Sequence, residues 1–241
     1  MKFLELTFDE PAANLACDEA LIEMMEADVS RDSGDDCLRI WEAKTYFVVV
    51  GHSERVKSSV NVAACNGHRI PILRRISGGG TVVQGPGCLN YSLILKHSAC
   101  LTNIRDTFSY VLERHRSVME KVCGVTARFE GISDLALDGF KFSGNAQYRK
   151  ARFVLVHGTF LLNFDLSVLE TLLPVPAKQP AYRRNRSHLE FVTNLHVDPS
   201  RLCGGLKNVW ACADNLHDVP FARIDQLVRD RYTNSDWSEK F

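Results

Sequence analysis

Hydrophobic and polar positions recur along the chain with two periods, which together predict helices interleaved with strands. Apolar residues at three- and four-residue steps predict helices over 11–26, 61–68, 103–122, 166–173 and 221–232. Apolar or alternating runs bounded by glycine, proline or polar residues predict strands over 37–41, 46–50, 69–73, 81–84, 89–95, 134–137, 140–144 and 153–162. Polar stretches over 29–36 and 177–188 are typical of loops. Because hairpins occur among these elements, we expect an α+β fold, a mixed β-sheet with packed helices.

Two helices are predicted most clearly. In the first, the apolar residues share one face, and we expect Asp18, Glu19 and Glu23 to lie on other faces. In the helix over 103–122, His115 lies on or beside the apolar stripe, which favours a packed residue over a catalytic one.

Charge and composition narrow the classes of function. Lys+Arg and Asp+Glu both number 29, so nothing indicates bulk binding to nucleic acid or to a membrane surface. The 241 residues, 45% of them hydrophobic, suffice for one large domain, alone or with a small appendage. No apolar run approaches a membrane span, and the acidic N-terminus lacks a signal-peptide core. The eight scattered cysteines lack metal-ligand spacing, so we expect free thiols in a cytoplasmic protein without a structural zinc site.

One stretch, RRISGGGTVVQGPGCLNYS over 74–92, contains the first candidate chemistry. Arg74 and Arg75 precede Ser77, and three glycines follow: Gly78, Gly79 and Gly80. Consecutive glycines allow another molecule to approach bare backbone, and two guanidiniums beside them suit an anion such as phosphate. The residues alone leave open a glycine-rich connection with exposed arginines. The stretch is not a P-loop, because no G-K-[ST] follows, and a strand rather than a dinucleotide-binding helix comes next.

A second stretch, DGFKFSGNAQYRKARFVLVHGTFLLN over 138–163, contains the second candidate. On the returning strand of a hairpin, alternation predicts that Lys141 and Ser143 point to one face and the neighbouring phenylalanines to the other. The small residues Gly144 and Ala146 follow, so a ligand close to the backbone would meet the lysine. An exposed strand lysine without a ligand is the alternative.

The two stretches together resemble the lipoate–protein ligase A family. The patterns are R-R-x-S-G-G-G-[TA]-V with G-x-x-N-Y-S, and G-x-K-x-S-G-x-A with H-G-T-x-L-L-N. Segments in the same order support the match from about residue 8 to about residue 196: Asn14-Leu15-Ala16 with Glu19, Ser133-Asp134-Leu135 and Val192-Thr193-Asn194-Leu195. The resemblance implies a biotin/lipoate protein ligase-like catalytic domain over 1–198. We expect residues 199–241 to form a short C-terminal extension, with no full accessory domain.

The resemblance also implies an activity. Such enzymes use ATP, with Mg²⁺, to convert lipoate or octanoate to an acyl-adenylate. They then transfer the acyl group to a lysine of a lipoyl carrier domain of 2-oxoacid dehydrogenase or glycine-cleavage complexes. Lys141 is the implied catalytic residue, stabilising charge at the acyl carbonyl and phosphate. Substrate- or adenylate-binding roles are implied for Arg74, Arg75, Ser77, Gly78, Gly79, Gly80, Asp134, Ser143, Gly144, Ala146, His157 and Gly158.

Several alternatives remain open at this point. Asp134 either orients Lys141 by an ion pair or is a surface acid, and no carboxylate cluster marks a metal site. Either a separate accessory chain supports adenylation, or the chain does not activate free lipoate itself.

An octanoyl or lipoyl transferase without ATP activation would need a reactive cysteine, but Asp134 stands in the loop where single-chain cysteine transferases carry theirs. Cys88 is expected to be a buried hydrophobe. A lipoyl-AMP-binding protein is the non-enzyme alternative. The basic run over 178–186 is a solvated loop or faces an acidic carrier domain.

Overall fold

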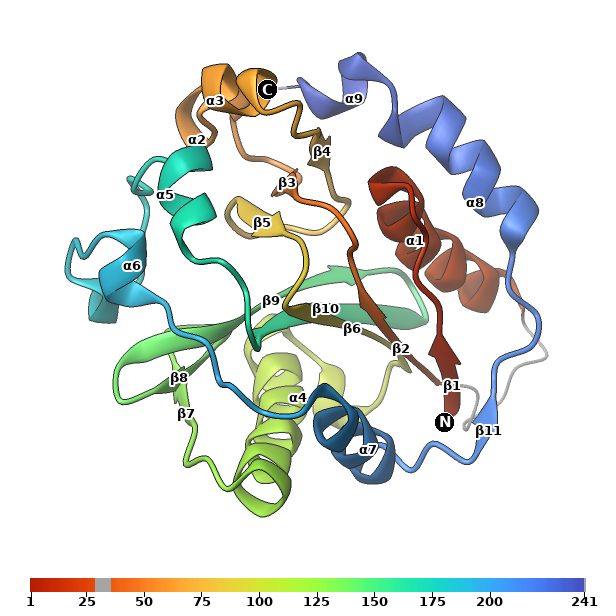
Figure 1. The fold of residues 1–241 in the computed structure, drawn as a ribbon. Helices are drawn as coiled ribbons and strands as arrows, with labels where there is room; N and C mark the ends of the chain where they lie inside the picture. The colour runs from red at the N-terminus through yellow and green to blue at the C-terminus, as the bar shows by residue number, and fades with distance from the viewer. Residues whose placement is uncertain (29–35, 241) are drawn as a thin grey trace.

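The computed structural model describes residues 1–28 and 36–240, which form two β-sheets with helices around them (Figure 1). The predicted loop over 29–36 lies almost entirely outside the described residues. The strands are β1 Lys2–Glu5, β2 Cys37–Glu42, β3 Phe47–Val50, β4 Ile72–Arg74, β5 Val82–Gln84, β6 Cys88–Lys96, β7 Arg128–Glu130, β8 Asp134–Leu137, β9 Phe140–Arg149, β10 Phe153–Leu161 and β11 Asp214–Asn215. The α-helices are α1 Pro11–Ala27, α2 Val56–Ser59, α3 Val62–Gly67, α4 Ile104–Val118, α5 Ser167–Leu172, α6 His188–Phe191, α7 Pro199–Val209, α8 Phe221–Leu227 and α9 Ser235–Ser238.

Both sheets mix parallel and antiparallel pairs, as the predicted fold class requires. Among the described residues the large sheet runs β11-β1-β2-β6-β10-β9-β8-β7, with its centre antiparallel and β1 parallel to both neighbours. The small sheet runs β4-β3-β5, with β3 parallel to β4 and antiparallel to β5. The α+β prediction is therefore confirmed.

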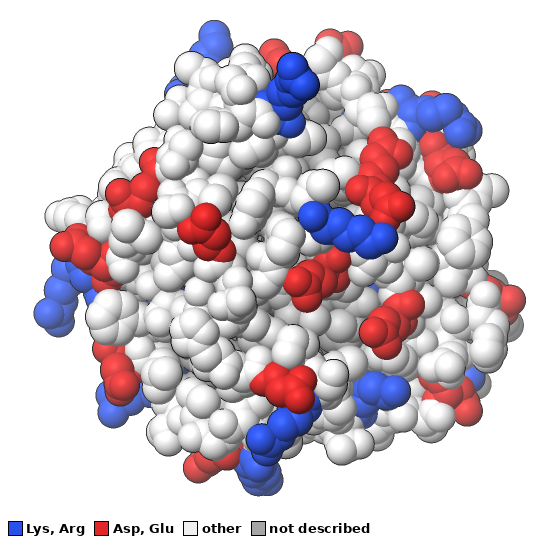
Figure 2. Space-filling model, in the orientation of Figure 1, with Lys and Arg blue, Asp and Glu red and all other residues white. Residues whose placement is uncertain are grey.

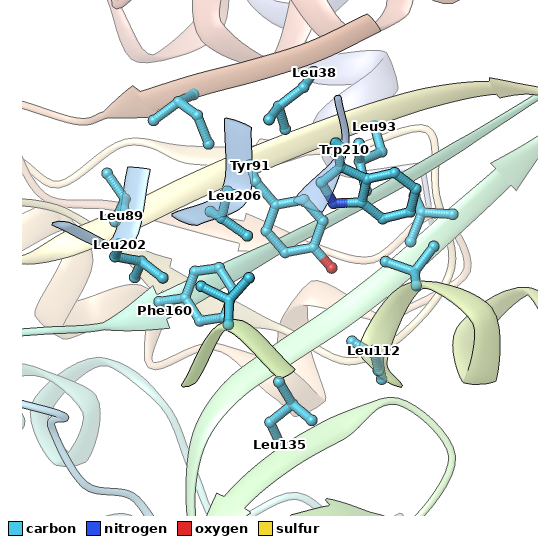
Figure 3. Packing of buried hydrophobic residues seen from close by; sticks show 14 of the residues in the cluster. Leu38, Leu89, Tyr91, Leu93, Leu112, Leu135, Phe160, Leu202, Leu206 and Trp210 are labelled. Carbon is cyan, nitrogen blue, oxygen red and sulfur yellow. The ribbon is translucent and has the colours of Figure 1, made fainter. Parts of the chain in front are cut away.

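The large sheet separates two hydrophobic cores. Helices α4 and α7 cover one face, where Tyr91 and Phe160 from the central strands pack with Trp210 (Figure 3). Helices α1 and α8 lie side by side on the other face, against residues such as Ile94 and Leu155 (Figure 1). A third core joins the small sheet to α5. Residues beyond 198 thus contribute to both cores of the large sheet.

The α1 face of the large sheet changes character along its length. On β6 and β10, the apolar Ile94 and Leu155 give way to Ser92 and His157, which are paired across the strands, and then to Asn90 and Thr159. The small sheet approaches this polar stretch, because Ser77 in the loop after β4 contacts His157. A polar strip is therefore enclosed between two sheets, which is an unusual location for polar groups unless they are hydrogen-bonded or functional.

Two polar segments are more buried than their patterns suggest. Asp18 and Glu19, predicted on faces of the helix other than the apolar one, are buried as well, because the sheet and the residues after α8 cover α1 on both sides. The basic run over 178–186 is only partly solvated. Arg183 is 4% exposed and stacks on Phe191, whereas Lys178 and Arg184 are exposed. Basic and acidic side chains are interspersed on the face in Figure 2, and no helix in the described part is long and apolar enough to cross a membrane.

Candidate active site

The glycine loop is folded around the side chain of Arg75. The guanidinium donates from Nη2 to the carbonyl oxygens of Gly78 and Gly80, each at 2.7 Å, and from Nε to Ser77 Oγ at 3.0 Å. Arg75 is 7% exposed, whereas the three glycines are exposed. Burial lowers the pKa of Arg75 to about 10, so the group is still a cation at neutral pH. The loop thus presents bare backbone with a fixed positive charge directly beneath it.

Arg74 points the other way and anchors the loop to two distant segments. Its guanidinium donates to the carbonyls of Gly51 and Glu54, each at 2.8 Å, and to those of Trp237 and Ser238 in α9, each at 3.0 Å. The side chain is fully buried, so these donors face backbone carbonyls. Binding of an anion by Arg74 stays a prediction.

The lysine of the second motif is held in an ion pair. Lys141 Nζ lies 2.7 Å from Asp134 Oδ1 on the adjacent strand β8, and the hydroxyl of Tyr182 donates to Asp134 Oδ2 at 2.8 Å. The ion pair predicted as one of two alternatives for Asp134 is therefore present. Burial and the neighbouring carboxylate raise the pKa of the Tyr182 hydroxyl, which keeps it a donor.

A β-bulge determines which face the lysine reaches. The register of β8 against β9 shifts between Leu135 and Ala136, so Leu135 pairs with Ser143 but Ala136 pairs with Lys141, and Phe142 is the extra residue. The Lys141 ammonium contacts the Asp134–Gly144 side, whereas Ser143 is 2% exposed on the opposite side. The prediction that Lys141 and Ser143 share a face is wrong, because strict alternation does not hold through a bulge.

The two motifs meet along one face of β9. A Cβ on Gly144 would lie 2.8 Å from Lys141 Nζ, and a Cβ on Gly79 would lie 3.8 Å from that of Ala146. Gly144 and Ala146 are two residues apart on the strand, so they share a face and are separated by roughly 7 Å. The glycine loop and the lysine therefore border the same narrow region, where the small residues leave backbone within reach of a ligand.

His157 lies on the neighbouring strand and joins the glycine loop to the protein interior. Its Nε2 is 2.6 Å from Ser77 Oγ, and its Nδ1 is 3.1 Å from Asp18 Oδ2 in α1. Asp18 also forms a buried ion pair with Arg39 at 2.7 Å and accepts a hydrogen bond from Ser92 at 2.7 Å. Although burial opposes it, the hydrogen bond from His157 and the charge of Arg39 lower the pKa of Asp18, which stays ionised.

Gly158, next to His157 on β10, leaves space for a side chain on the opposite face of the sheet. A side chain at Gly158 would overlap Asn145, whose side chain bonds Tyr91 and the carbonyl of Ser133, each at 2.6 Å. The structure therefore brings together most of the predicted residues: Arg75, Ser77, Gly79, Asp134, Lys141, Gly144, Ala146 and His157. Ser143 and Gly158 support the strand from behind.

Sequence reasoning missed several residues of this region. Asp18 was placed only on a face of the helix other than the apolar one, and Tyr182 lies in a run interpreted only by its charge. Gly51, which follows the predicted strand over 46–50, was given no role, yet a side chain there would overlap the carbonyl of Gly79. The alternation of Asn90 and Ser92 with apolar residues in β6 was a signal that one strand face is polar. No group of three metal-ligating side chains occurs among residues 1–28 and 36–240.

Comparison with known proteins identifies the family of the chain. Lipoate–protein ligase 1 of Staphylococcus aureus is 26% identical over 99% of this chain and 73% of that protein. The octanoyltransferase LipM of Oceanobacillus iheyensis is 25% identical over 99% of this chain and 91% of that protein. A structure described as a bi-partite lipoate protein ligase and its E2 lipoyl domain, from Thermoplasma acidophilum, covers 99% of this chain and 96% of its own, with a TM-score of 0.81 at 22% identity. The model of the lipoyl protein ligase A/B catalytic domain matches residues 10–199, so the chain belongs to that family.

Proposed function

We propose that this chain is a lipoate–protein ligase, which activates lipoate or octanoate as an acyl-adenylate and transfers the acyl group to a lysine of a carrier domain. Family membership and the ligase relative support the reaction class. The observation that carries the proposal is the meeting of the two motifs on β9, with Gly79 beside Ala146 and Lys141 beside Gly144. Backbone without large side chains, with Arg75 near one end and Lys141 near the other, suits a long acyl chain joined to a phosphate.

The chemistry explains why both ends need a cation. A free carboxylate is a poor electrophile, so amide formation requires an activated acid. The carboxylate displaces pyrophosphate from the α-phosphate of ATP, and AMP is then the leaving group when the carrier amine attacks the acyl carbonyl. The carboxylate and the α-phosphate repel each other, and Arg75 under the glycine loop and Lys141 on the hairpin offset that repulsion. Lys141 would then stabilise the charge that develops on the acyl oxygen as the carrier amine attacks. Asp134 and Tyr182 would hold the lysine in place for this step.

Magnesium is expected to enter with the nucleotide. Mg²⁺ commonly binds through substrate phosphates and few protein carboxylates, which is compatible with a site of arginine, lysine and backbone groups. For the acceptor, we propose lipoyl carrier domains of 2-oxoacid dehydrogenase or glycine-cleavage complexes. The Thermoplasma neighbour, described as bi-partite, supports a role for a separate accessory chain in adenylation.

A transferase that uses an octanoyl thioester without ATP is the second candidate, favoured by the LipM relative. Such a reaction needs an accessible thiolate near Lys141. Cys88, the cysteine nearest in sequence to the glycine loop, is fully buried, and burial raises its pKa far above the usual value. Position 134 is an aspartate that already pairs with Lys141. These observations favour the ligase.

The decisive experiment is the ATP dependence of carrier acylation, measured with lipoate and the purified chain, alone and with candidate accessory chains. We expect acylation with ATP, and a loss of roughly 100-fold or more in Lys141→Ala without a change in fold. Lys150→Ala is a matched control, because that lysine lies beyond the end of the same strand and is about as exposed (side chains 26% and 27%). Acylation from octanoyl carrier protein without ATP would contradict the ligase in favour of the transferase.

A further inference from the structure

A continuous set of hydrogen bonds links the first helix to the glycine loop. It runs from Asp18 Oδ2 to His157 Nδ1 at 3.1 Å, from His157 Nε2 to Ser77 Oγ at 2.6 Å, and from Ser77 Oγ to Arg75 Nε at 3.0 Å. The members come from α1, β10 and the loop after β4, and each is largely buried. The far end is fixed, because Arg39 pairs with the other oxygen of Asp18 at 2.7 Å.

Donor and acceptor accounting fixes the direction of these bonds. Arg75 Nε only donates, so Ser77 Oγ accepts there and has its own proton to give. Ser77 Oγ can give this proton to His157 Nε2 at 2.6 Å when the imidazole carries its own proton on Nδ1. That Nδ1–H donates to Asp18, a carboxylate that only accepts. One neutral tautomer of His157 therefore satisfies every group, and Asp18 selects it.

The distances resemble those of an Asp-His-Ser catalytic triad, but the environment of Ser77 is unlike that of a nucleophile. Ser77 is 1% exposed, and its oxygen already accepts a hydrogen bond from the cationic Arg75. Accepting such a bond withdraws electron density from the oxygen. The serine is instead placed to hold the guanidinium that organises the carbonyls of Gly78 and Gly80.

We propose that Asp18, acting through His157, is a positioning residue that holds Ser77 as an acceptor for Arg75 and so fixes the glycine loop that binds the acyl-adenylate. This role rests on the function proposed above, because the glycine loop is taken there to bind the acyl-adenylate.

Asp18→Asn tests the proposal with little change of shape. Arg39 would keep the amide oxygen, so the amide nitrogen would face His157 and donate to Nδ1. The imidazole proton would then lie on Nε2 and point at Ser77 Oγ. That oxygen would face two donors, His157 Nε2–H and Arg75 Nε–H. We expect binding of lipoyl-sulfamoyl-adenosine, a non-hydrolysable mimic of lipoyl-AMP, to weaken roughly tenfold by calorimetry, with KM for lipoate raised in parallel.

A double variant distinguishes positioning from general support of the fold. If Asp18 acts through Ser77, Asp18→Asn combined with Ser77→Ala should bind the mimic as Ser77→Ala does, within about twofold. His157→Gln, alone and with Ser77→Ala, repeats the test while leaving the Asp18–Arg39 ion pair intact, in case the asparagine variant does not fold. Tyr232→Phe is the matched control, because it removes a hydrogen bond from Glu19, the neighbouring buried carboxylate of α1, and should leave the affinity unchanged.

Three results would overturn the proposal. The first is that both Asp18→Asn and His157→Gln bind the mimic with the parental affinity. The second is that the affinity losses of the single variants multiply in the double variants, and the third is that a fluorophosphonate labels Ser77, which would make it a nucleophile. A parent chain that binds the mimic but never acylates a carrier would refute the proposed function, while the affinities would still decide this inference. A parent that does not bind the mimic would refute both.

Discussion

Gly144 is the residue that lets a lysine and a carboxylate share the surface of β9. The Lys141 side chain crosses directly over its Cα, and the Asp134 carboxylate lies beside it. Any side chain at this position competes with the lysine for the same space. The flexible end of Lys141 can move away, so the fold should tolerate a methyl group while the position of the ammonium should not.

Gly144→Ala should therefore fold and lose activity. We expect a fall in the rate of carrier acylation of roughly tenfold or more, because displacing a charged group by about 1 Å from its working position is costly. Thermal unfolding should change little. Gly204→Ala in α7 is the control, since no atom lies within 4 Å of its added Cβ, and it should keep full activity. Parental rates in Gly144→Ala would mean that Lys141 does not act from the observed position.

The limits of sequence reasoning are also visible at this scale. Lys141 and the glycine loop were found because their spacing forms motifs that are local in the chain. Asp18 was missed because helical periodicity places charged residues outside. Its burial is made favourable by contacts with Arg39, Ser92 and His157, which lie 21 or more positions later in the chain. Partners of that kind are determined by tertiary packing, which a periodic pattern does not encode.

At the scale of elements, α9 supports the glycine loop from outside. The indole Nε1–H of Trp237 donates to the carbonyl of Arg74 at 2.9 Å, and Arg74 returns two bonds to carbonyls of the helix. Arg231 lies over the indole ring at 4.9 Å and pairs with Glu19 of α1. The short helix is thus joined both to the root of the glycine loop and to the first helix.

Trp237→Ala should weaken both stability and substrate binding. We expect a loss of about 2 kcal/mol in urea unfolding, because a large, partly buried aromatic and its hydrogen bond are removed. KM for lipoate should rise, since the loop loses its support. Phe221→Ala is the matched control in the same tail, because Phe221 is 53% exposed. An unchanged KM would show that α9 stabilises the fold without shaping the site.

Helices with strong apolar periodicity were predicted, whereas helix α7, which contains two adjacent glycines, was not. Helix α4 was expected from its apolar stripe and is confirmed, with a π-helical extension over Met119–Cys123. Helix α7 was missed because Cys203-Gly204-Gly205 does not suggest a helix. In the structure a side chain at Gly205 would overlap Val118, so the glycine permits close packing of α7 on α4. Helix α7 is therefore stabilised by tertiary contacts rather than by the helix propensity of its residues.

For the whole molecule, the buried His115 makes stability depend on pH. Burial lowers its pKa to about 3, and its Nε2 accepts a hydrogen bond from Trp210 at 3.1 Å. In the unfolded chain a histidine has a pKa near 6.5, so below that pH the unfolded state takes up a proton that the native state does not. The contribution of His115 to the free energy of unfolding is therefore fully present above about pH 6.5 and is lost as the pH falls towards 3.

His115→Gln should flatten this dependence. At pH 5 the linkage predicts that the parent has lost about 2 kcal/mol relative to pH 7 through His115 alone. Glutamine keeps an acceptor for Trp210 without titrating, so urea unfolding at the two pH values should differ less in the variant. A smaller slope should remain, because burial also lowers the pKa of His52 and His188. Equal slopes in parent and variant would contradict the assignment.

The docking of α9 on Arg74 has a consequence for biosynthesis. Arg74 and Trp237 are hydrogen-bonded across 163 positions, so the base of the glycine loop is held in place only after nearly all of the described chain has been made. While still attached to the ribosome, the nascent protein would have its sheets and cores largely assembled but its loop unsecured. A protein fused after residue 240 therefore needs a spacer long enough to let α9 pack against Arg74.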